Sequence, residues 1–267
     1  MIVQWVSRAL LALLCTIVCV PLVYILAISL VATTNPNFPL TVAGYQVPNL
    51  AYFDVLFLTP EFHIMFWNTC CLTAATIAAQ VIIAIPAAWV FSRWKSRAGR
   101  LIFALYILLM LLPFQAAMLP NYLALNKLAM LDSLPGVILI SAFNTLPVFI
   151  IEHFFSSIPR NTIESAAIDG ASEFRILLEI GIPTALPGII AAMVLSIFEI
   201  WNMIEQPLAF LHSQALWPLS MYLPNMSYDT LGTMCAIAVL SAIPSLLVFL
   251  ACEKQLEQGI STLMSKD

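Results

Sequence analysis

Long apolar runs constrain this sequence more than any other feature. A helix that crosses the hydrocarbon core of a bilayer needs about 20 mostly apolar residues. Six runs of this kind can be drawn, over residues 10–32, 64–91, 101–119, 135–151, 186–208 and 231–252. Of the 267 residues, 62% are hydrophobic and 9% charged, whereas soluble domains are roughly half apolar and a quarter charged. The sequence therefore predicts an all-α polytopic membrane protein, with residues 1–267 as a single transmembrane domain.

The first run and the cysteines have simple interpretations. Arg8 precedes the first run, as in a secretory signal peptide, but the run exceeds the usual signal length and predicts an uncleaved span. The six cysteines all fall within or at the ends of apolar runs. Such cysteines are typical of buried small apolar side chains, so we expect no disulfide framework, no metal site and no cofactor.

The basic residues predict the orientation of the chain. If the N-terminus lies in the cytoplasm, nine of the ten Lys and Arg residues fall on the cytoplasmic side, and only Lys127 falls outside. The segment RWKSRAGR between the second and third runs contributes most to this asymmetry. Because cytoplasmic loops carry the excess of positive charge, both termini are predicted to be cytoplasmic.

One polar segment, ESAAIDGASEFRILLEIGIP, interrupts the apolar pattern between the fourth and fifth runs. Ser157, Pro159 and Asn161, with Glu164 three positions after Asn161, are typical of a helix start. Gly170 is placed to end that helix in the left-handed conformation, and Ser172 to cap a second one. We expect two short helices that form a rigid cytoplasmic projection.

The same segment resembles the permease subunits of binding-protein-dependent ABC importers. Their cytoplasmic loop reads Glu-Ala-Ala, three residues, Gly, nine residues, Ile, one residue, Leu-Pro. This chain has Glu164-Ser165-Ala166, Gly170, Ile180 and Ile182-Pro183 at that spacing. The resemblance implies six transmembrane helices with a cytoplasmic coupling-helix loop, residues 152–183, between spans four and five. It assigns ATPase coupling to Glu164, Ser165, Ala166, Ala167, Asp169, Gly170, Ile180 and Pro183.

More of the chain resembles the carbohydrate branch of this family, to which the shorter permease of the maltose importer belongs. Asp169-Gly170-Ala171, FEIWNMIEQPL and MLPNYLALNKLAMLDS are similar to segments of sugar permeases, whereas the ending LMSKD departs from them. The resemblance implies a bacterial inner-membrane location. It also implies four kinds of partner: membrane lipid, two copies of a cytosolic ABC ATPase, a second homologous permease, and an extracytoplasmic solute-binding protein. No nucleic acid is expected.

Polar residues inside the apolar runs are candidates for the substrate path, because an acid near mid-membrane costs about 2.5–3.5 kcal/mol. At 100° per residue, Ser196, Glu199, Asn202 and Gln206 would share one face of a helix. Gln115 and Asn144 are further candidates. The alternative is that these groups join helices or contact a second permease.

The sequence contains no motif for nucleotide binding or catalysis. No Gly-x-x-x-x-Gly-Lys-Ser/Thr, His-Glu-x-x-His or Gly-x-Ser-x-Gly is present. We therefore expect no catalytic residues, and a transporter subunit driven by a separate ATPase. Two alternatives stay open: a permease for a non-sugar solute such as a polyamine, and a non-transport membrane subunit that docks an ATPase.

Overall fold

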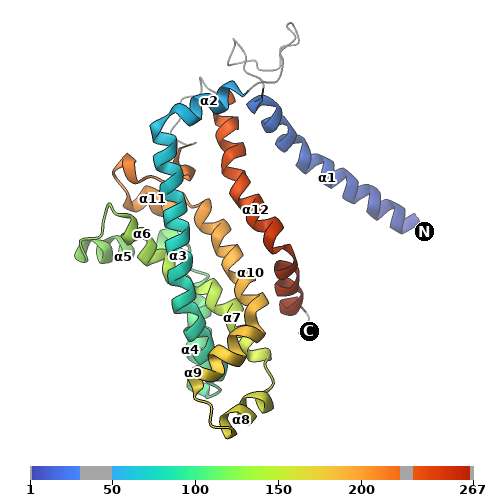
Figure 1. The fold of residues 1–267 in the computed structure, drawn as a ribbon, viewed down its shortest axis with the longest axis vertical. Coiled ribbons are helices and arrows are strands. Elements are labelled where there is room, and N and C mark those ends of the chain that lie inside the picture. The colour runs from blue at the N-terminus through green and yellow to red at the C-terminus, as the bar shows by residue number, and fades with distance from the viewer. Residues whose placement is uncertain (1, 31–49, 223–230, 265–267) are drawn as a thin grey trace.

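The computed structural model describes residues 2–30, 50–222 and 231–264, and the regular structure in these ranges is helical (Figure 1). The main helices are α1 Ile2–Ser29, α2 Ala51–Leu58, α3 Pro60–Arg93, α4 Arg97–Leu109, α5 Phe114–Lys127, α6 Leu134–Ala142, α7 Thr145–Ser157, α8 Arg160–Ile168, α9 Glu173–Ile176, α10 Ile182–Trp201, α11 Glu205–Phe210 and α12 Leu231–Met264. A π-helical segment, Leu177–Gly181, joins α9 to α10, and 3-10 turns follow α11 at Gln214–Leu216 and Leu219–Met221.

Five helical stretches in the described ranges are long and apolar enough to cross a membrane: Leu10–Ser29, Pro60–Arg93, Leu134–Ser157, Glu173–Trp201 and Leu231–Gly259. They correspond to the first, second, fourth, fifth and sixth predicted runs. Residues 31–32, the end of the first predicted run, and residues 265–267 of the C-terminal tail lie outside the described residues. The prediction of an all-α membrane protein is confirmed.

The third predicted span is not one helix. The chain instead forms two helices, α4 and α5, whose axes are bent by 98° at the break between them. The described residues contain six candidate spans only if this pair is counted as one span. Pro113 caps α5 and has no N–H to continue a helix. The residue before a proline is also pushed out of the helical conformation, which places the break at this point. The expected continuous helix over 101–119 was therefore wrong.

The fifth predicted span differs at both ends. Helical structure starts at Glu173, well before residue 186, because Ser172 caps it and the π segment carries it on into α10. It stops at Trp201, and a separate α11 follows. Pro207 explains the early stop, since a continuing helix would lose the bond that its missing N–H would donate to the residue 203 carbonyl. The expectation of a helix to residue 208 was wrong.

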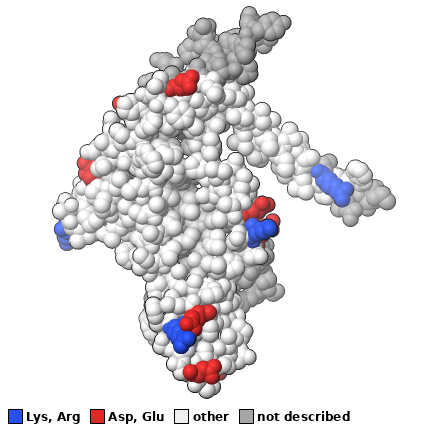
Figure 2. Space-filling view, in the orientation of Figure 1, with Lys and Arg blue, Asp and Glu red and all other residues white. Residues whose placement is uncertain are grey.

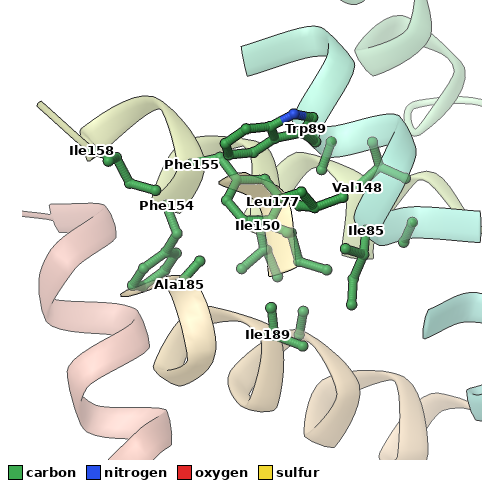
Figure 3. Packing of buried hydrophobic residues seen from close by; sticks show 14 of the residues in the cluster. Ile85, Trp89, Val148, Ile150, Phe154, Phe155, Ile158, Leu177, Ala185 and Ile189 are labelled. Carbon is green, nitrogen blue, oxygen red and sulfur yellow. The ribbon is translucent and has the colours of Figure 1, made fainter. Parts of the chain in front are cut away.

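The end of the bundle that carries α8 and α9 has a dense apolar core (Figure 3). The ring of Trp89 on α3 meets Phe155 on α7 edge to face, with 5.1 Å between centroids. Gly181 fits against the same Trp89, because a Cβ there would lie 2.8 Å from the indole. Gly188 on α10 lies even closer to Phe154, where a Cβ would be 2.2 Å from the ring. Side chains from three helices therefore interlock in this core.

The outer surface of the bundle is mostly apolar. Figure 1 shows α1 leading away from the group formed by α3, α10 and α12. Its side chains are exposed along most of its length, as at Trp5 (67%) and Val20 (60%). In Figure 2 few charged side chains interrupt the visible surface, and one group lies at the lower end, where α8 and α9 are found. This distribution agrees with a chain that has lipid or other membrane subunits around it.

Candidate functional site

The segment between α7 and α10 forms a projection whose central helix is α8. Its helix ends in a Schellman motif: Gly170 N–H donates to Ala167 O (3.1 Å) and Ala171 N–H to Ala166 O (3.0 Å). Gly170 has φ +85°, a conformation that residues with a Cβ rarely adopt. Both the helix and its glycine stop agree with the sequence prediction.

The start of α8 lies among the residues predicted to begin a helix. The helix begins at Arg160 after Pro159, which has no side chain able to cap it. Asn161 is the second residue of the helix, and its Oδ1 accepts from Thr162 N–H (3.0 Å). The predicted helix start is confirmed, and α8 begins without a side-chain cap.

The second half of the segment is also anchored differently from the prediction. Ser172 accepts from Arg175 N–H (3.3 Å), as expected for a cap. The helix that it starts is not a separate short helix, because it continues through the π segment into α10. Ile182 N–H reaches back five residues to Leu177 O, and Pro183 follows with no N–H to offer. The projection thus consists of the short helix α8, which the Gly170 turn connects to the start of the long helix Glu173–Trp201.

Predicted coupling residues divide into two groups by position. Glu164, Ser165, Ala167, Asp169 and Gly170 are exposed on the projection, and Ala166 is half-buried. Ile180 packs half-buried against the apolar core, and Pro183 lies in the first turn of α10. The first group is placed to contact another protein, whereas Ile180 and Pro183 belong to the long helix that supports it.

Two exposed apolar side chains on the projection were missed by sequence reasoning. Ile168 is 86% exposed and Phe174 69% exposed, and they flank the Gly170 turn in the chain. Large apolar groups this exposed on a polar segment indicate a protein contact. The signal was available in the sequence, because both interrupt an otherwise polar stretch.

A second feature is a cavity of about 670 Å³ beside the breaks in the helices. It is lined by the ends of α4 and α6, the start of α7, the end of α10, and residues of α3, α5 and α11. Irregular backbone at membrane depth is tolerated where it lines a polar cavity or is buried in protein. The breaks at Pro113, Asn144 and Asn202 are therefore parts of the cavity wall.

Two side-chain pairs organise the polar wall of this cavity. Asn144 accepts from Leu146 N–H through Oδ1, which caps α7, and donates from Nδ2 to Glu199 Oε2 (2.8 Å). Ser141 Oγ donates to Gln206 Oε1 (2.6 Å). Each pair joins the broken α6–α7 span to the end of α10 or to α11. The cap on α7 also gives the reason for the break in the fourth predicted span.

Three of the predicted substrate-path residues lie together and three lie elsewhere. Glu199, Gln206 and Asn144 line the cavity. Asn202 donates to Phe198 O on its own helix, Ser196 is fully buried, and Gln115 donates to Glu205 Oε1 at 3.0 Å. The expected single-helix stripe was wrong, because α10 ends at Trp201; Gln206 reaches the cavity from α11.

Gln80 is a lining residue that sequence reasoning missed. It is 1% exposed, donates from Nε2 to Ser141 O (2.9 Å), and its Oε1 has no hydrogen-bond partner in the described part of the chain. The available signal was an amide in the middle of the 34-residue apolar helix α3, which carries one other amide, Asn68. Asn121 and Thr145, also at the cavity, complete its polar lining. Among the described residues, no group of three or more His, Cys, Asp or Glu side chains is placed to hold a metal ion.

Comparison with known proteins gives a consistent result. The family model described as "Binding-protein-dependent transport system inner membrane component" matches residues 80–261. The diacetylchitobiose uptake system permease protein NgcG of Streptomyces coelicolor is 26% identical over 96% of this chain and 87% of its own length. The lactose transport system permease protein LacG of Rhizobium radiobacter is 22% identical over 86% of each chain.

Solved structures resemble the fold over almost the whole chain. A subunit of a bacterial ABC transporter involved in the import of the acidic polysaccharide alginate superposes with a TM-score of 0.83 at 23% identity. The match covers 95% of this chain and 96% of that one. A chain of the MetNI methionine ABC transporter superposes with a TM-score of 0.60 over 76% of this chain. The chain therefore has the fold of these transporter subunits.

Proposed function

Because the chain belongs to the family of binding-protein-dependent transport system inner membrane components, we propose that it is the permease subunit of a carbohydrate ABC importer. Its membrane-spanning helices and its family make it a multi-pass membrane transport component. The carbohydrate substrate is supported by relatives whose names include diacetylchitobiose and lactose uptake. A cavity lined by hydroxyl and amide groups suits sugar hydroxyls, which both donate and accept hydrogen bonds.

The proposed assembly contains two cytosolic ABC ATPase copies, a second homologous permease and an extracytoplasmic binding protein. The positive-inside distribution of Lys and Arg supports a cytoplasmic position for both termini and for the α8 projection. The projection, with Glu164 through Gly170 and the exposed Ile168 and Phe174, is the surface we assign to the ATPase. In this assignment the chain itself carries no catalytic site.

One observation carries the mechanism: the helix that supports the projection ends at the cavity. Helical structure runs unbroken from Glu173 to Trp201, and Glu173 lies about 40 Å from Glu199 at the helical rise. The first half of this helix, with Ile176, Leu177 and Ala185, is buried in the same apolar core as Trp89. A displacement of α8 by the ATPase would therefore move α10 as a rigid body and change the cavity wall at Glu199.

Substitution of Gly170 tests this lever. Gly170→Val places a β-branched side chain at φ +85°, which should disorder the α8 turn, whereas Gly170→Asn keeps a residue type that tolerates the left-handed region. In the complex reconstituted in vesicles, we expect Gly170→Val to retain membrane insertion but lose most ATP-driven uptake. Gly170→Asn should keep uptake near wild type. Normal uptake by Gly170→Val would contradict the lever.

Purification identifies the remaining parts of the proposal. A tag on this chain should isolate the two ATPase copies and the second permease, and the binding protein should be screened against a panel of sugars and polyamines. Recovery of the chain without any ATPase would contradict the importer assignment. A binding protein that takes a polyamine and no sugar would replace the carbohydrate substrate with the non-sugar alternative.

A further inference from the structure

The cavity wall carries negative charge without a balancing positive charge among its described lining residues. Among the described residues that line the cavity, Glu199 is the single ionisable side chain, and no Lys, Arg or His reaches it. Glu199 is exposed to the cavity space, and its hydrogen-bond partner among the described residues is the neutral amide of Asn144, at 2.8 Å. The carboxylate thus has a hydrogen bond but no cation to balance it.

A second acceptor in the wall has no partner. Gln80 is 1% exposed, its amide nitrogen is occupied by Ser141 O, and its Oε1 accepts no hydrogen bond from the described residues. A buried acceptor left in this state costs about 1–3 kcal/mol unless something donates to it. Gln80 Oε1 is buried within the wall, so Glu199 is the acceptor that a solute in the cavity can reach.

The physical consequence is a preference among solutes by charge. In a site partly shielded from water, a carboxylate within several ångströms repels an anion and attracts a cation more strongly than in bulk solvent. Neutral sugars can donate to the Glu199 carboxylate from their hydroxyl groups, and amino sugars can do so from an ammonium group. Uronic acids bring a second carboxylate to the same place and find no cation in the wall.

We propose that this cavity selects solutes by charge, admitting neutral and amino sugars and excluding anionic sugars such as uronates. The identity of the solute as a carbohydrate rests on the proposed function, whereas the charge rule rests on Glu199 and on the lack of a cation among the described lining residues. Fold likeness does not decide the matter, since a protein of the same fold belongs to a transporter of an acidic polysaccharide.

The charge rule can be measured without knowing the substrate. Ala117, which lines the cavity, is changed by Ala117→Cys in a chain whose native cysteines are replaced by Ser. The full-length chain, with the subunits that copurify, is placed in lipid nanodiscs. The thiol is then modified with cationic and anionic methanethiosulfonates, and each rate is divided by that for a free thiol. The ratio of the two rates cancels any change in thiolate fraction.

We expect the cationic reagent to react about tenfold faster than the anionic one. Glu199→Gln, and Glu199→Ala as a second neutral variant, should bring the ratio to within about twofold of one. Glu205→Gln is the matched control, because Glu205 also accepts from an amide, that of Gln115, but does not line the cavity. This control should keep most of the wild-type ratio. Equal rates in the wild type, or a ratio that neither Glu199 variant lowers, would overturn the charge rule.

Protection of the same thiol separates the charge rule from the proposed function. Three sugars are each added before modification with a neutral methanethiosulfonate. They are cellobiose (neutral), the disaccharide of glucosamine (cationic) and cellobiuronic acid (anionic). Protection by the first two and not by the uronate supports the proposal, and protection by the uronate overturns it. A tenfold charge ratio with no protection by any sugar would support the charge rule and count against the carbohydrate assignment.

Discussion

The two ends of the Glu173–Trp201 helix are built in opposite ways. At the projection end, Trp89, Phe154 and Phe155 fill the space between helices and leave room for only glycine at two positions on the long helix and the π segment. At the other end, α6 and α10 stop and a cavity lies between the helix ends. Hydrogen bonds from Asn144 to Glu199 and from Ser141 to Gln206 join these ends. Dense packing transmits a displacement, while a broken and polar wall can change shape. The contrast supports the proposal that force enters at one end and solute passes at the other.

The largest effect that sharpens this contrast is expected from Phe155. Phe155→Ala removes a ring that is 2% exposed and packed on Trp89, and should lower the free energy of unfolding by about 3–5 kcal/mol. The matched change is Phe143→Ala, because Phe143 is 62% exposed and lines the cavity. It should cost less than about 1 kcal/mol. Both are measured by denaturant unfolding of the purified chain in detergent.

Similar losses for the two phenylalanine variants would break the comparison. That outcome would mean that the cavity wall is packed as firmly as the Trp89 core. The hollow at α10 would then be unable to change shape when the projection moves.

An intermediate effect is expected from the polar pair in the cavity wall. Ser141→Ala removes the hydrogen bond to Gln206 (2.6 Å), and should cost about 0.6–1 kcal/mol of unfolding free energy. Ser157→Ala is the control, since its hydroxyl bonds only to Phe154 O in its own helix. If Ser157→Ala proves the more damaging, the wall does not depend on bonds between its broken helices.

The smallest effect is expected from the hydrogen bonds of Asp132, which join two loops outside the spans. We call this contact the Asp132 latch. Asp132, at φ +51°, accepts from the His212 and Ser213 N–H groups (2.7 and 2.9 Å) and from Ser213 Oγ (2.9 Å). The backbone and hydroxyl bonds of Ser213, followed by the backbone bond of His212, lower the pKa of Asp132 below its ordinary value. A carboxyl with a lowered pKa stabilises the fold above its unfolded pKa, and this stabilisation is lost as pH falls through the lowered value.

Hydrogen exchange at His212 and Ser213 measures this latch. Protection of both amides, corrected for intrinsic exchange, should hold from pH 7 to about pH 4, near the ordinary pKa of Asp, and decline below it. Asp132→Asn keeps one acceptor oxygen and cannot ionise, so its protection should be weaker and independent of pH. A wild-type profile without a decline at low pH would show that Asp132 does not hold the two loops together.

The sequence predicted the spans and the projection because both follow from local rules. A bilayer requires long apolar helices, so five of the six runs appear as candidate spans and the third run as a bent pair. Gly170 and Ser172 act on neighbouring backbone groups, and both behaved as predicted. The helix start predicted around Ser157 to Glu164 also appears, at Arg160.

The cavity was only partly predictable, since it depends on where helices stop in three dimensions. Pro113 and Pro207 lie inside apolar runs, where hydropathy alone cannot tell a kink from a break. Once α10 ended at Trp201, Asn202 and Gln206 no longer shared a face, although Gln206 still reached the cavity from α11. Gln80 contacts the break in α6–α7 through Ser141 O, a long-range bond with no local signature.

The central claim is that movement of the α8 projection changes the cavity at the far end of the same helix. The most direct measurement is the reaction rate of Ala117→Cys with a neutral methanethiosulfonate, in the purified complex without nucleotide and after trapping with ATP and vanadate. The account predicts that trapping changes this rate in the wild type and leaves it unchanged in Gly170→Val. A wild-type rate that is the same in both states would contradict it.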